Sequence, residues 1–473
     1  MLFTSPQFLL MFLPITFTVF LFLQRFNNLK ISSLWLLLAS IAFYLFWNPH
    51  DLLPLIFSIV VNFILYRWMS LKTGHLKTLI LIIALLFNLI LLGYYKYFHF
   101  IFGLNHETTT TATIPLGISF YTFTQIAFLV DCYKNNYQNN DFLNYSLFVS
   151  YFPHLVCGPI ISFKDLYPQL TNPKKFHFSS KSMALFIFCF SIGLFKKTFI
   201  ADQFGDFVAA FFDAPGMPYF GQKTAFLGVV SYSLQLYFDF SGYSDMAVGL
   251  SYLFGLQIPD NFNSPYQSTS IIEFWRRWHI SLSSFLKNYL YIPLGGNRKH
   301  HYLNVFITMV LGGLWHGASW TFIVWGAYQG VLLSINHWWR NKTPKPATTN
   351  SSFKVYCKKT FKTLFIFTLI SLGWVLFRSA NLETAYHIYS SLLGISKKLP
   401  QTIESYCSIK LMLAALLWVF LIPDTLVLRE QFLTVIEKKS HFLIRIAALL
   451  CAILSTFGLI ALSRVQYFLY SGF

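Results

Sequence analysis

Apolar stretches long enough to cross a lipid bilayer recur along the whole chain of 473 residues. A helix needs about 20 mainly apolar residues to span roughly 30 Å of hydrocarbon, and spanning backbone must satisfy its own hydrogen bonds. Hydrophobic residues make up 55% of the sequence and charged residues only 11%, which leaves no polar stretch for a separate soluble domain. We therefore predict an all-α polytopic membrane protein, with residues 1–473 in a single membrane-embedded domain.

The apolar pattern predicts about twelve membrane-embedded helices. The first, Phe8 to Leu23, has no basic residue before it and no small-residue cleavage site, so we interpret it as a retained span and not a signal peptide. Two aromatic stretches, 147–161 and 271–292, are interrupted by proline or charge, and we expect them to be re-entrant or interfacial. The expected helix centres lie near Ile15, Leu38, Ile59, Leu86, Tyr121, Phe190, Leu234, Met309, Trp325, Phe367, Ala415 and Leu449.

The net charge of +18 reflects membrane orientation and does not indicate nucleic-acid binding. Basic residues gather in alternate loops, such as 340–362, whereas 201–222 has three aspartates and no Lys or Arg. Loops rich in Lys and Arg stay on the cytoplasmic side of a membrane. We therefore expect both termini, including the short tail 464–473, on the extracytoplasmic side.

Two histidines stand out because their surroundings offer little water. His316, in Leu314-Trp-His-Gly317, lies in the apolar run from Val305 to Trp338, and His279 follows Phe274-Trp-Arg-Arg-Trp278. Ionisable groups within a membrane are rare and mark functional sites by default. A histidine that merely bonds a carbonyl in the core is the alternative for His316, and an interfacial structural role is the alternative for His279. A metal site is the least favoured interpretation. Neither histidine has a second ligand at a spacing such as HxxxH, and the six cysteines form no CxxC pair.

Polar residues are unusually dense in the central third of the chain. Asp239, Tyr243 and Asp245 lie on one otherwise apolar helix, and Asn263 follows it. Each carboxylate there needs a donor or a water-filled space. Further on, Leu294-Gly-Gly-Asn-Arg-Lys299 has the glycines and cations to approach a phosphorylated ligand. A loop that only orients the membrane helices would look the same.

Several of these motifs together resemble the membrane-bound O-acyltransferase family, in particular its bacterial branch of alginate and peptidoglycan O-acetyltransferase membrane subunits and teichoic-acid D-alanylation proteins. The resemblance extends over nearly the whole chain in the family's order. One departure is His154, where the family pattern has glutamine. The motifs that carry the resemblance are Tyr237-Phe-Asp-Phe-Ser-Gly-Tyr-Ser-Asp245, Phe274-Trp-Arg-Arg-Trp-His279, Tyr291-Ile-Pro-Leu-Gly-Gly-Asn297 and Leu314-Trp-His-Gly317.

The resemblance implies helices around a central tunnel, in the inner membrane of a bacterium, with His316 as the catalytic histidine and His279 as a second catalytic position. Acyl transfer needs a base for an incoming hydroxyl, and a buried imidazole stays neutral and suits that role. No bound cofactor is implied; acetyl-CoA is the expected acyl donor. We expect its phosphates near Arg276, Arg277, Arg298 and Lys299, and the tunnel to be lined by Asp239, Asp245, Tyr243, Asn263 and Trp315.

The C-terminal Phe468-Leu-Tyr470-Ser-Gly-Phe473 resembles the aromatic ending of acetyltransferases in this branch. The resemblance implies that Tyr470 relays the acyl group to an extracytoplasmic SGNH/esterase-like O-acetyltransferase, which acts on an exported glycan. Tyr470 as an interfacial anchor in the membrane lipid is an equal alternative. Transfer of D-alanyl or another acyl group to envelope polymers is a further alternative, and a transporter or flippase would also use intramembrane Asp239, Asp245 and His316.

Overall fold

The computed structural model describes residues 1–102, 114–135, 141–214, 220–342, 353–395 and 407–464, and within these ranges the chain is helical without a β-sheet. The first ten α-helices are α1 (Leu13–Gln24), α2 (Leu29–Leu45), α3 (Leu52–Ser70), α4 (Gly74–Leu92), α5 (Phe98–Phe102), α6 (Ile118–Asn135), α7 (Phe142–Ser150), α8 (Phe152–Leu155), α9 (Phe163–Leu170) and α10 (Ser180–Leu194). They are followed by α11 (Gly205–Phe212), α12 (Gln222–Leu253), α13 (Ile271–Arg277), α14 (Ile280–Leu286), α15 (His301–His316), α16 (Trp320–Lys342), α17 (Phe353–Arg378), α18 (Leu382–Leu392), α19 (Ile409–Leu421), α20 (Thr425–Glu437) and α21 (His441–Ile460).

Short π- and 3₁₀-segments interrupt or extend these helices. The π-segments are η1 (Phe8–Phe12), η3 (Gly93–Tyr97), η4 (Phe195–Ala201) and η7 (Lys287–Tyr291), and the 3₁₀-segments are η2 (Pro49–Asp51), η5 (Asp202–Phe204), η6 (Pro265–Gln267) and η9 (Ala461–Arg464). A π-segment inside a helix locally changes the direction in which side chains point, and such segments often occur at functional sites.

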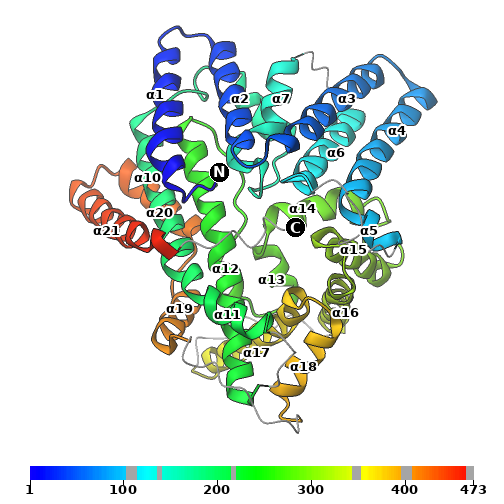
Figure 1. Ribbon diagram of the computed structural model, residues 1–473, viewed down its shortest axis with the longest axis vertical. Helices are drawn as coiled ribbons and strands as arrows, with labels where there is room; N and C mark the ends of the chain where they lie inside the picture. The colour runs from blue at the N-terminus through cyan, green and yellow to red at the C-terminus, as the bar shows by residue number, and fades with distance from the viewer. Residues whose placement is uncertain (103–113, 136–140, 215–219, 343–352, 396–406, 465–473) are drawn as a thin grey trace.

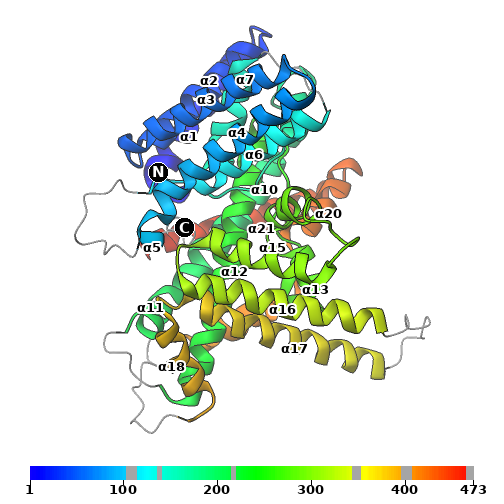
Figure 2. The same ribbon diagram turned by 90° about the vertical axis from the view of Figure 1, so that its right-hand side faces the viewer.

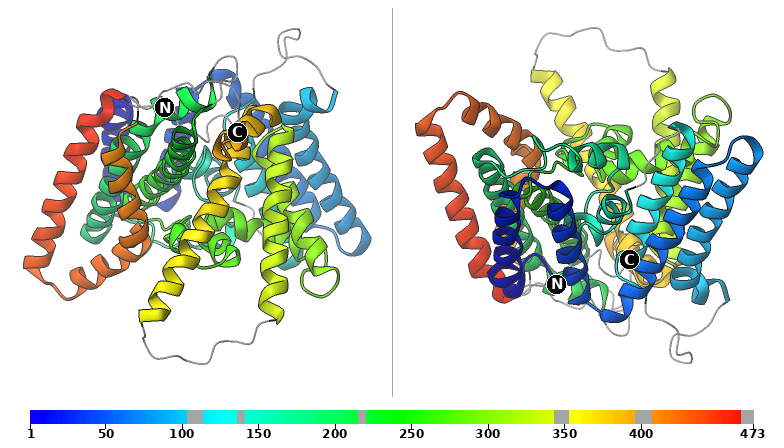
Figure 3. Two further views of the ribbon diagram at one scale, coloured as in Figure 1. Left: turned by 90° about the horizontal axis from the view of Figure 1, so that it is seen from below. Right: turned by 90° about the horizontal axis from the view of Figure 1, so that it is seen from above.

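The long helix α12 runs through the middle of the molecule, and α10 packs along it (Figure 1). The helices α1–α4, α6 and α7 gather at one end, whereas α16, α17 and α18 lie at the other (Figure 2). The helices α20 and α21 flank one side (Figure 3). Because α12 is surrounded by the rest of the protein, it can carry polar residues that a lipid-facing helix could not.

The length and composition of the helices support a multi-pass membrane protein. Five described stretches are long and apolar enough to span a membrane, and the pair α19 and α20, bent by 63°, would make a sixth. All twelve expected centres lie within helices. However, α15 has only 16 residues and α12 carries buried Asp239 and Asp245, so neither is among the stretches with the length and apolar composition of a span. The count of about twelve spans therefore stays a prediction.

The two stretches that we expected to be broken are broken. Helix α7 ends at Ser150, the four-residue α8 follows, and the chain then continues without helix to Ser162. Residues 271–292 form α13, α14 and η7 instead of one continuous helix. At these breaks, backbone N–H and C=O groups have no partner within a helix, so they need hydrogen bonds from other parts of the protein or from water.

Buried ion pairs connect η4 to α12 and to the bend between α19 and α20. The Lys196 ammonium lies 2.9 Å from Asp245 and 3.4 Å from Asp424, and it also donates to the Thr425 hydroxyl at 2.9 Å. The neighbouring Lys197 lies 2.6 Å from both Asp202 and Asp239. The carboxylates on α12 thus find ammonium partners within the protein, as buried charges require.

Candidate active site

The helices α15 and α16 cross so closely that only glycine fits at the contact. A Cβ atom on Gly313 would lie 2.3 Å from the Phe322 carbonyl oxygen, and one on Gly326 would lie 2.4 Å from that of Met309. Small residues at such crossings let two helix backbones approach each other in a membrane. The crossing lies one turn before the end of α15, and it therefore fixes His316, the last residue of that helix.

His316 is buried and surrounded by aromatic rings. Its ring centroid lies 4.9 Å from that of Trp315, 5.3 Å from that of Trp325 and 5.0 Å from that of Phe377. Trp325 comes from α16 and Phe377 from α17, so three helices build this wall. Aromatic walls exclude water and make a cationic imidazole costly, which favours the neutral ring with a lone pair on one nitrogen.

His279 lies at the break between α13 and α14, in the left-handed backbone region with φ of 42°. Its Nδ1 is 3.3 Å from Asn261 Oδ1, and the same oxygen accepts the Ser281 hydroxyl at 2.7 Å and the Ser281 backbone N–H at 3.3 Å. The Ser281 backbone N–H can only donate, so the atom that it contacts is the amide oxygen of Asn261. His279 Nδ1 therefore donates the hydrogen, and the lone pair of the neutral ring is on Nε2.

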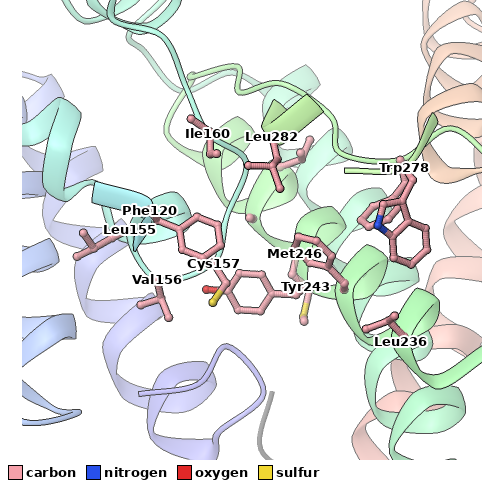
Figure 4. Close-up of a cluster of buried hydrophobic side chains, with 14 of the residues drawn as sticks. Phe120, Leu155, Val156, Cys157, Ile160, Leu236, Tyr243, Met246, Trp278 and Leu282 are labelled. Atoms are coloured by element: carbon pink, nitrogen blue, oxygen red, sulfur yellow. The ribbon is translucent and has the colours of Figure 1, made fainter. Parts of the chain in front are cut away.

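Both imidazoles lie beside the same indole. The Trp315 ring centroid is 6.3 Å from that of His279 and 4.9 Å from that of His316. The segment that carries His279 is anchored by Trp278 and Leu282, which share one apolar cluster with Leu236 of α12 (Figure 4). The structure thus brings together the two histidines that the sequence analysis selected.

A cavity of about 450 Å³ extends along one face of α15 and ends at His316. His301 and His316 both line it and are fifteen residues apart on one helix, which corresponds to about 22 Å at 1.5 Å per residue. His316 is buried, whereas the residues near His301 are partly or fully exposed, so the cavity opens at the His301 end. The residues of α15 that line it are His301, Val305, Thr308, Met309, Gly312 and His316.

Polar and basic residues surround the open end of the cavity. Arg276 and Lys287 line it, together with His301 and His337, whose ring centroids are 4.6 Å apart. The Tyr291 hydroxyl is 2.6 Å from both Asn297 Oδ1 and His301 Nδ1. This end could hold an anion, and the narrow apolar part beyond it could hold a slender chain.

Of the four expected donor-binding residues, only Arg276 lines this cavity. The Arg277 guanidinium is 2.8 Å from the Glu273 carboxylate and also contacts the Asn263 carbonyl. Arg298 and Lys299 are exposed on the turn before α15 and do not line the cavity. Arg276 and Arg277 are neighbours on a short helix, and about 100° separates successive side chains there.

The expected tunnel-lining residues lie around the site, but none of them lines this cavity. Asp239 and Asp245 form the buried ion pairs described above. Tyr243 stacks on Phe3, with ring centroids 4.7 Å apart, and Trp315 lies behind His316. The backbone N–H of Asn263 donates to the Arg277 carbonyl at 3.0 Å. Their expected role in a tunnel stays a prediction, and Tyr470 and the tail from 465 to 473 lie outside the described residues.

Two further residues of the site, Lys96 and Asn261, were not predicted from the sequence. Lys96 is buried beside the end of α15, and its Nζ donates to the Trp315 carbonyl at 2.5 Å. A lysine inside an apolar run is a signal that could have found it. Asn261 has no comparable signal, because an asparagine after a helix is ordinary turn chemistry.

The fold and this cavity define a multi-pass membrane protein with a buried pair of histidines, of which His316 lies at the inner end of a cavity. The family model described as MBOAT, membrane-bound O-acyltransferase family, matches residues 63–377. This chain belongs to the membrane-bound O-acyltransferase family, and it is an acyltransferase.

The chain is similar to curated bacterial acyltransferases, to two of them over more than four fifths of its length. It is 40% identical to the peptidoglycan O-acetyltransferase of Helicobacter pylori, over 84% of this chain and 80% of that protein. It is 39% identical to the probable alginate O-acetylase AlgI of Pseudomonas aeruginosa, over 83% of this chain and 75% of that protein. The similarity to the teichoic acid D-alanyltransferase of Streptococcus thermophilus is 31% identity over 48% of this chain and 58% of that protein.

Proposed function

We propose that this enzyme takes acetyl from cytoplasmic acetyl-CoA and passes it across the inner membrane for O-acetylation of an exported polysaccharide, either peptidoglycan or an alginate-like polymer. The observation that carries the proposal is the cavity that begins among Arg276, Lys287 and two histidines and ends at buried His316. Acetyl-CoA has the matching shape, with phosphates at one end and a thioester at the end of a slender arm.

In the proposed reaction, His316 accepts the proton of an incoming hydroxyl while the hydroxyl oxygen forms a bond to the thioester carbonyl carbon. The tetrahedral intermediate then collapses, the carbon–sulfur bond breaks, and the thiolate of CoA takes the proton back from the imidazole. His279 lies beside the same indole with the lone pair of its neutral ring on Nε2, but it does not line the cavity, and its part in the reaction stays a prediction. The products are an O-acetyl ester and CoA.

We place the open end of the cavity on the cytoplasmic side and both termini on the extracytoplasmic side. The basic segment 340–362 begins in the last turn of α16, which carries Arg340 and Lys342, and His337 of the same helix lines the open end of the cavity. Tyr470 is then on the opposite side, where its hydroxyl could receive acetyl and pass it to a separate extracytoplasmic O-acetyltransferase.

Acetyl transfer is favoured over D-alanyl transfer by the comparisons. The relatives named for O-acetylation are 39–40% identical over more than four fifths of this chain, whereas the D-alanyltransferase is 31% identical over 48%. The peptidoglycan and alginate relatives are almost equally similar, so identity does not choose the glycan.

The test is to delete the gene and to complement it with the wild type, His316→Ala or His154→Gln. His154 is a matched control, because it is also buried but bonds the Phe148 carbonyl at 2.8 Å and does not line the cavity. We expect His316→Ala to abolish ester-linked acetate in the glycan at normal protein abundance, and His154→Gln to retain it, as measured by mass spectrometry. Acetylation that persists in His316→Ala would refute the catalytic role.

Replacing Tyr470 with Phe tests the relay separately, because this change removes the hydroxyl and keeps the aromatic ring. Loss of glycan acetylation supports the relay. Unchanged acetylation supports the membrane anchor.

A further inference from the structure

Lys96 is a buried lysine that has no carboxylate partner among the described residues. It lies in η3, inside the apolar stretch Gly74–Phe102, and only 6% of it is exposed. Lysine is almost never buried unless it is paired. The other deeply buried lysines, Lys196 and Lys197, are each paired with aspartates. An ion pair with a carboxylate therefore does not explain why Lys96 is buried.

The Lys96 ammonium binds the end of α15. Its Nζ donates to the Trp315 carbonyl oxygen at 2.5 Å and to the Ser119 hydroxyl at 3.1 Å. The last carbonyl groups of a helix have no partner within the helix, and the partial negative charge there favours a cation. Lys96 satisfies the carbonyl group directly before His316.

The next residue, Tyr97, does the same for the preceding carbonyl group. Its hydroxyl donates to the Leu314 carbonyl oxygen at 2.8 Å. Two consecutive residues of a π-segment thus cap two consecutive carbonyl groups, 219 and 217 residues away in sequence. Such a pair of bonds fixes both the position and the direction of the last turn of α15.

The indole of Trp315 transmits this arrangement to the histidines. Lys96 Nζ lies 5.7 Å from the Trp315 ring centroid, and the same ring stacks on Phe123 at 5.2 Å. His279 and His316 both lie beside this ring. A movement of the Trp315 backbone would therefore move the surface on which both imidazoles rest.

We propose that Lys96 is a positioning residue for His316, and that its ammonium, together with the Tyr97 hydroxyl, holds the imidazole where the cavity ends. This inference rests on the proposed function, because it assumes that His316 accepts the proton. An error of about 1 Å in such a group can cost about 10²-fold in rate. The effect should be on turnover and not on donor binding, because Lys96 does not line the cavity.

The test replaces Lys96 with Met and Tyr97 with Phe, singly and together. Lys77→Met is a matched control on the same apolar stretch: Lys77 Nζ also donates to a carbonyl oxygen, that of Tyr133 at 2.7 Å, and lies 4.8 Å from the centroid of an aromatic ring. Inverted membrane vesicles from a deletion strain receive labelled acetyl-CoA. Label that enters envelope esters is measured against donor concentration and per amount of enzyme.

We expect Lys96→Met to lower the maximal rate by about 10- to 100-fold with the KM for acetyl-CoA within about twofold. Tyr97→Phe should lower the maximal rate less. The fold-loss in the maximal rate of the double variant should be smaller than the product of the fold-losses of the two single variants. Lys96→Met should remain folded at the assay temperature, as its apparent melting temperature shows. The inference is overturned if Lys96→Met has a maximal rate as high as that of Lys77→Met, or if only its KM changes. It is also overturned if unfolding of the variant explains the loss of activity.

The wild type and His316→Ala in the same vesicles keep the two proposals apart. Wild-type activity that is lost in His316→Ala supports the proposed function whatever Lys96→Met does. In parallel, mass spectrometry of acyl esters in cells identifies the group transferred. If the esters in cells carry an acyl group other than acetyl, the proposed donor is wrong, but the rates of Lys96→Met and the wild type can still be compared. If the wild type transfers no acyl group, both proposals are refuted.

Discussion

Replacing Lys196 with methionine should destabilise the protein by about 3–5 kcal/mol, the usual loss when one partner of a buried ion pair is removed. The Lys196 and Asp424 side chains are each only 1% exposed, and that of Asp245 is 12% exposed. Methionine has nearly the same length and fills the same space, so the change removes the ammonium and little packing. Asp245 and Asp424 would then lose the cation that they share.

The entropy of unfolding is roughly 1 kcal/mol/K for a chain of 473 residues, at about 2.1 cal/mol/K per residue. The expected loss therefore corresponds to a fall of about 3–5 °C in melting temperature, which scanning fluorimetry in lipid nanodiscs can measure. Lys181→Met is the control, because it breaks an ion pair with Glu437 in which the two side chains are 50% and 65% exposed. That variant should lose at most about 1 kcal/mol.

Adding Asp245→Asn to Lys196→Met should restore part of the stability, because it neutralises one of the two carboxylates. If Lys196→Met is no less stable than Lys181→Met, the ion pairs do not hold η4 to α12. If the double variant is stable but inactive, Asp245 has a role in the reaction, as its expected place in a tunnel would require.

Two further predictions concern the cavity and the helix crossing. Arg276→Ala should raise the KM for acetyl-CoA by about three- to fivefold in the vesicle assay, because Arg276 lines the cavity and an exposed charge contributes at most about 1 kcal/mol. Arg298→Ala should leave the KM unchanged, because Arg298 does not line the cavity. Equal effects of the two changes would place the phosphates on the turn before α15. Gly326→Ala should cost about 1–3 kcal/mol through overpacking and should also lower activity, because the new methyl group would push α15 away from α16. A variant with unchanged melting temperature and activity would show that the crossing can relax without moving His316.

The sequence alone predicted the all-helical membrane protein and the two histidines, because hydropathy depends only on local composition. His316 and His279 were selected as ionisable groups in apolar surroundings, and the structure places both beside Trp315. The broken segment that carries His279 was also predicted, because charge and aromatic residues interrupt it. The chemistry of the individual residues was enough for these conclusions.

Partners that are distant in sequence could not be predicted. The bond from Lys96 to Trp315 connects residues 219 positions apart, and no local pattern specifies it. The need of Asp239 and Asp245 for partners was clear from the sequence, but Lys197 and Lys196 as those partners were not. Likewise, the sequence does not say which of Arg276 and Arg277 faces the cavity, because that depends on how α13 is rotated against α15 and α16.

The depth of the cavity has a consequence for the choice of thioester. A molecule held by its anionic end near His301, at the open end of the cavity, reaches His316 only if its arm extends about 22 Å, the rise of fifteen helical residues. Simple thioesters with a truncated arm would leave their carbonyl carbon short of the imidazole, however well their charges were bound. Chain length in the donor would thus act as a selection criterion independent of the acyl group itself.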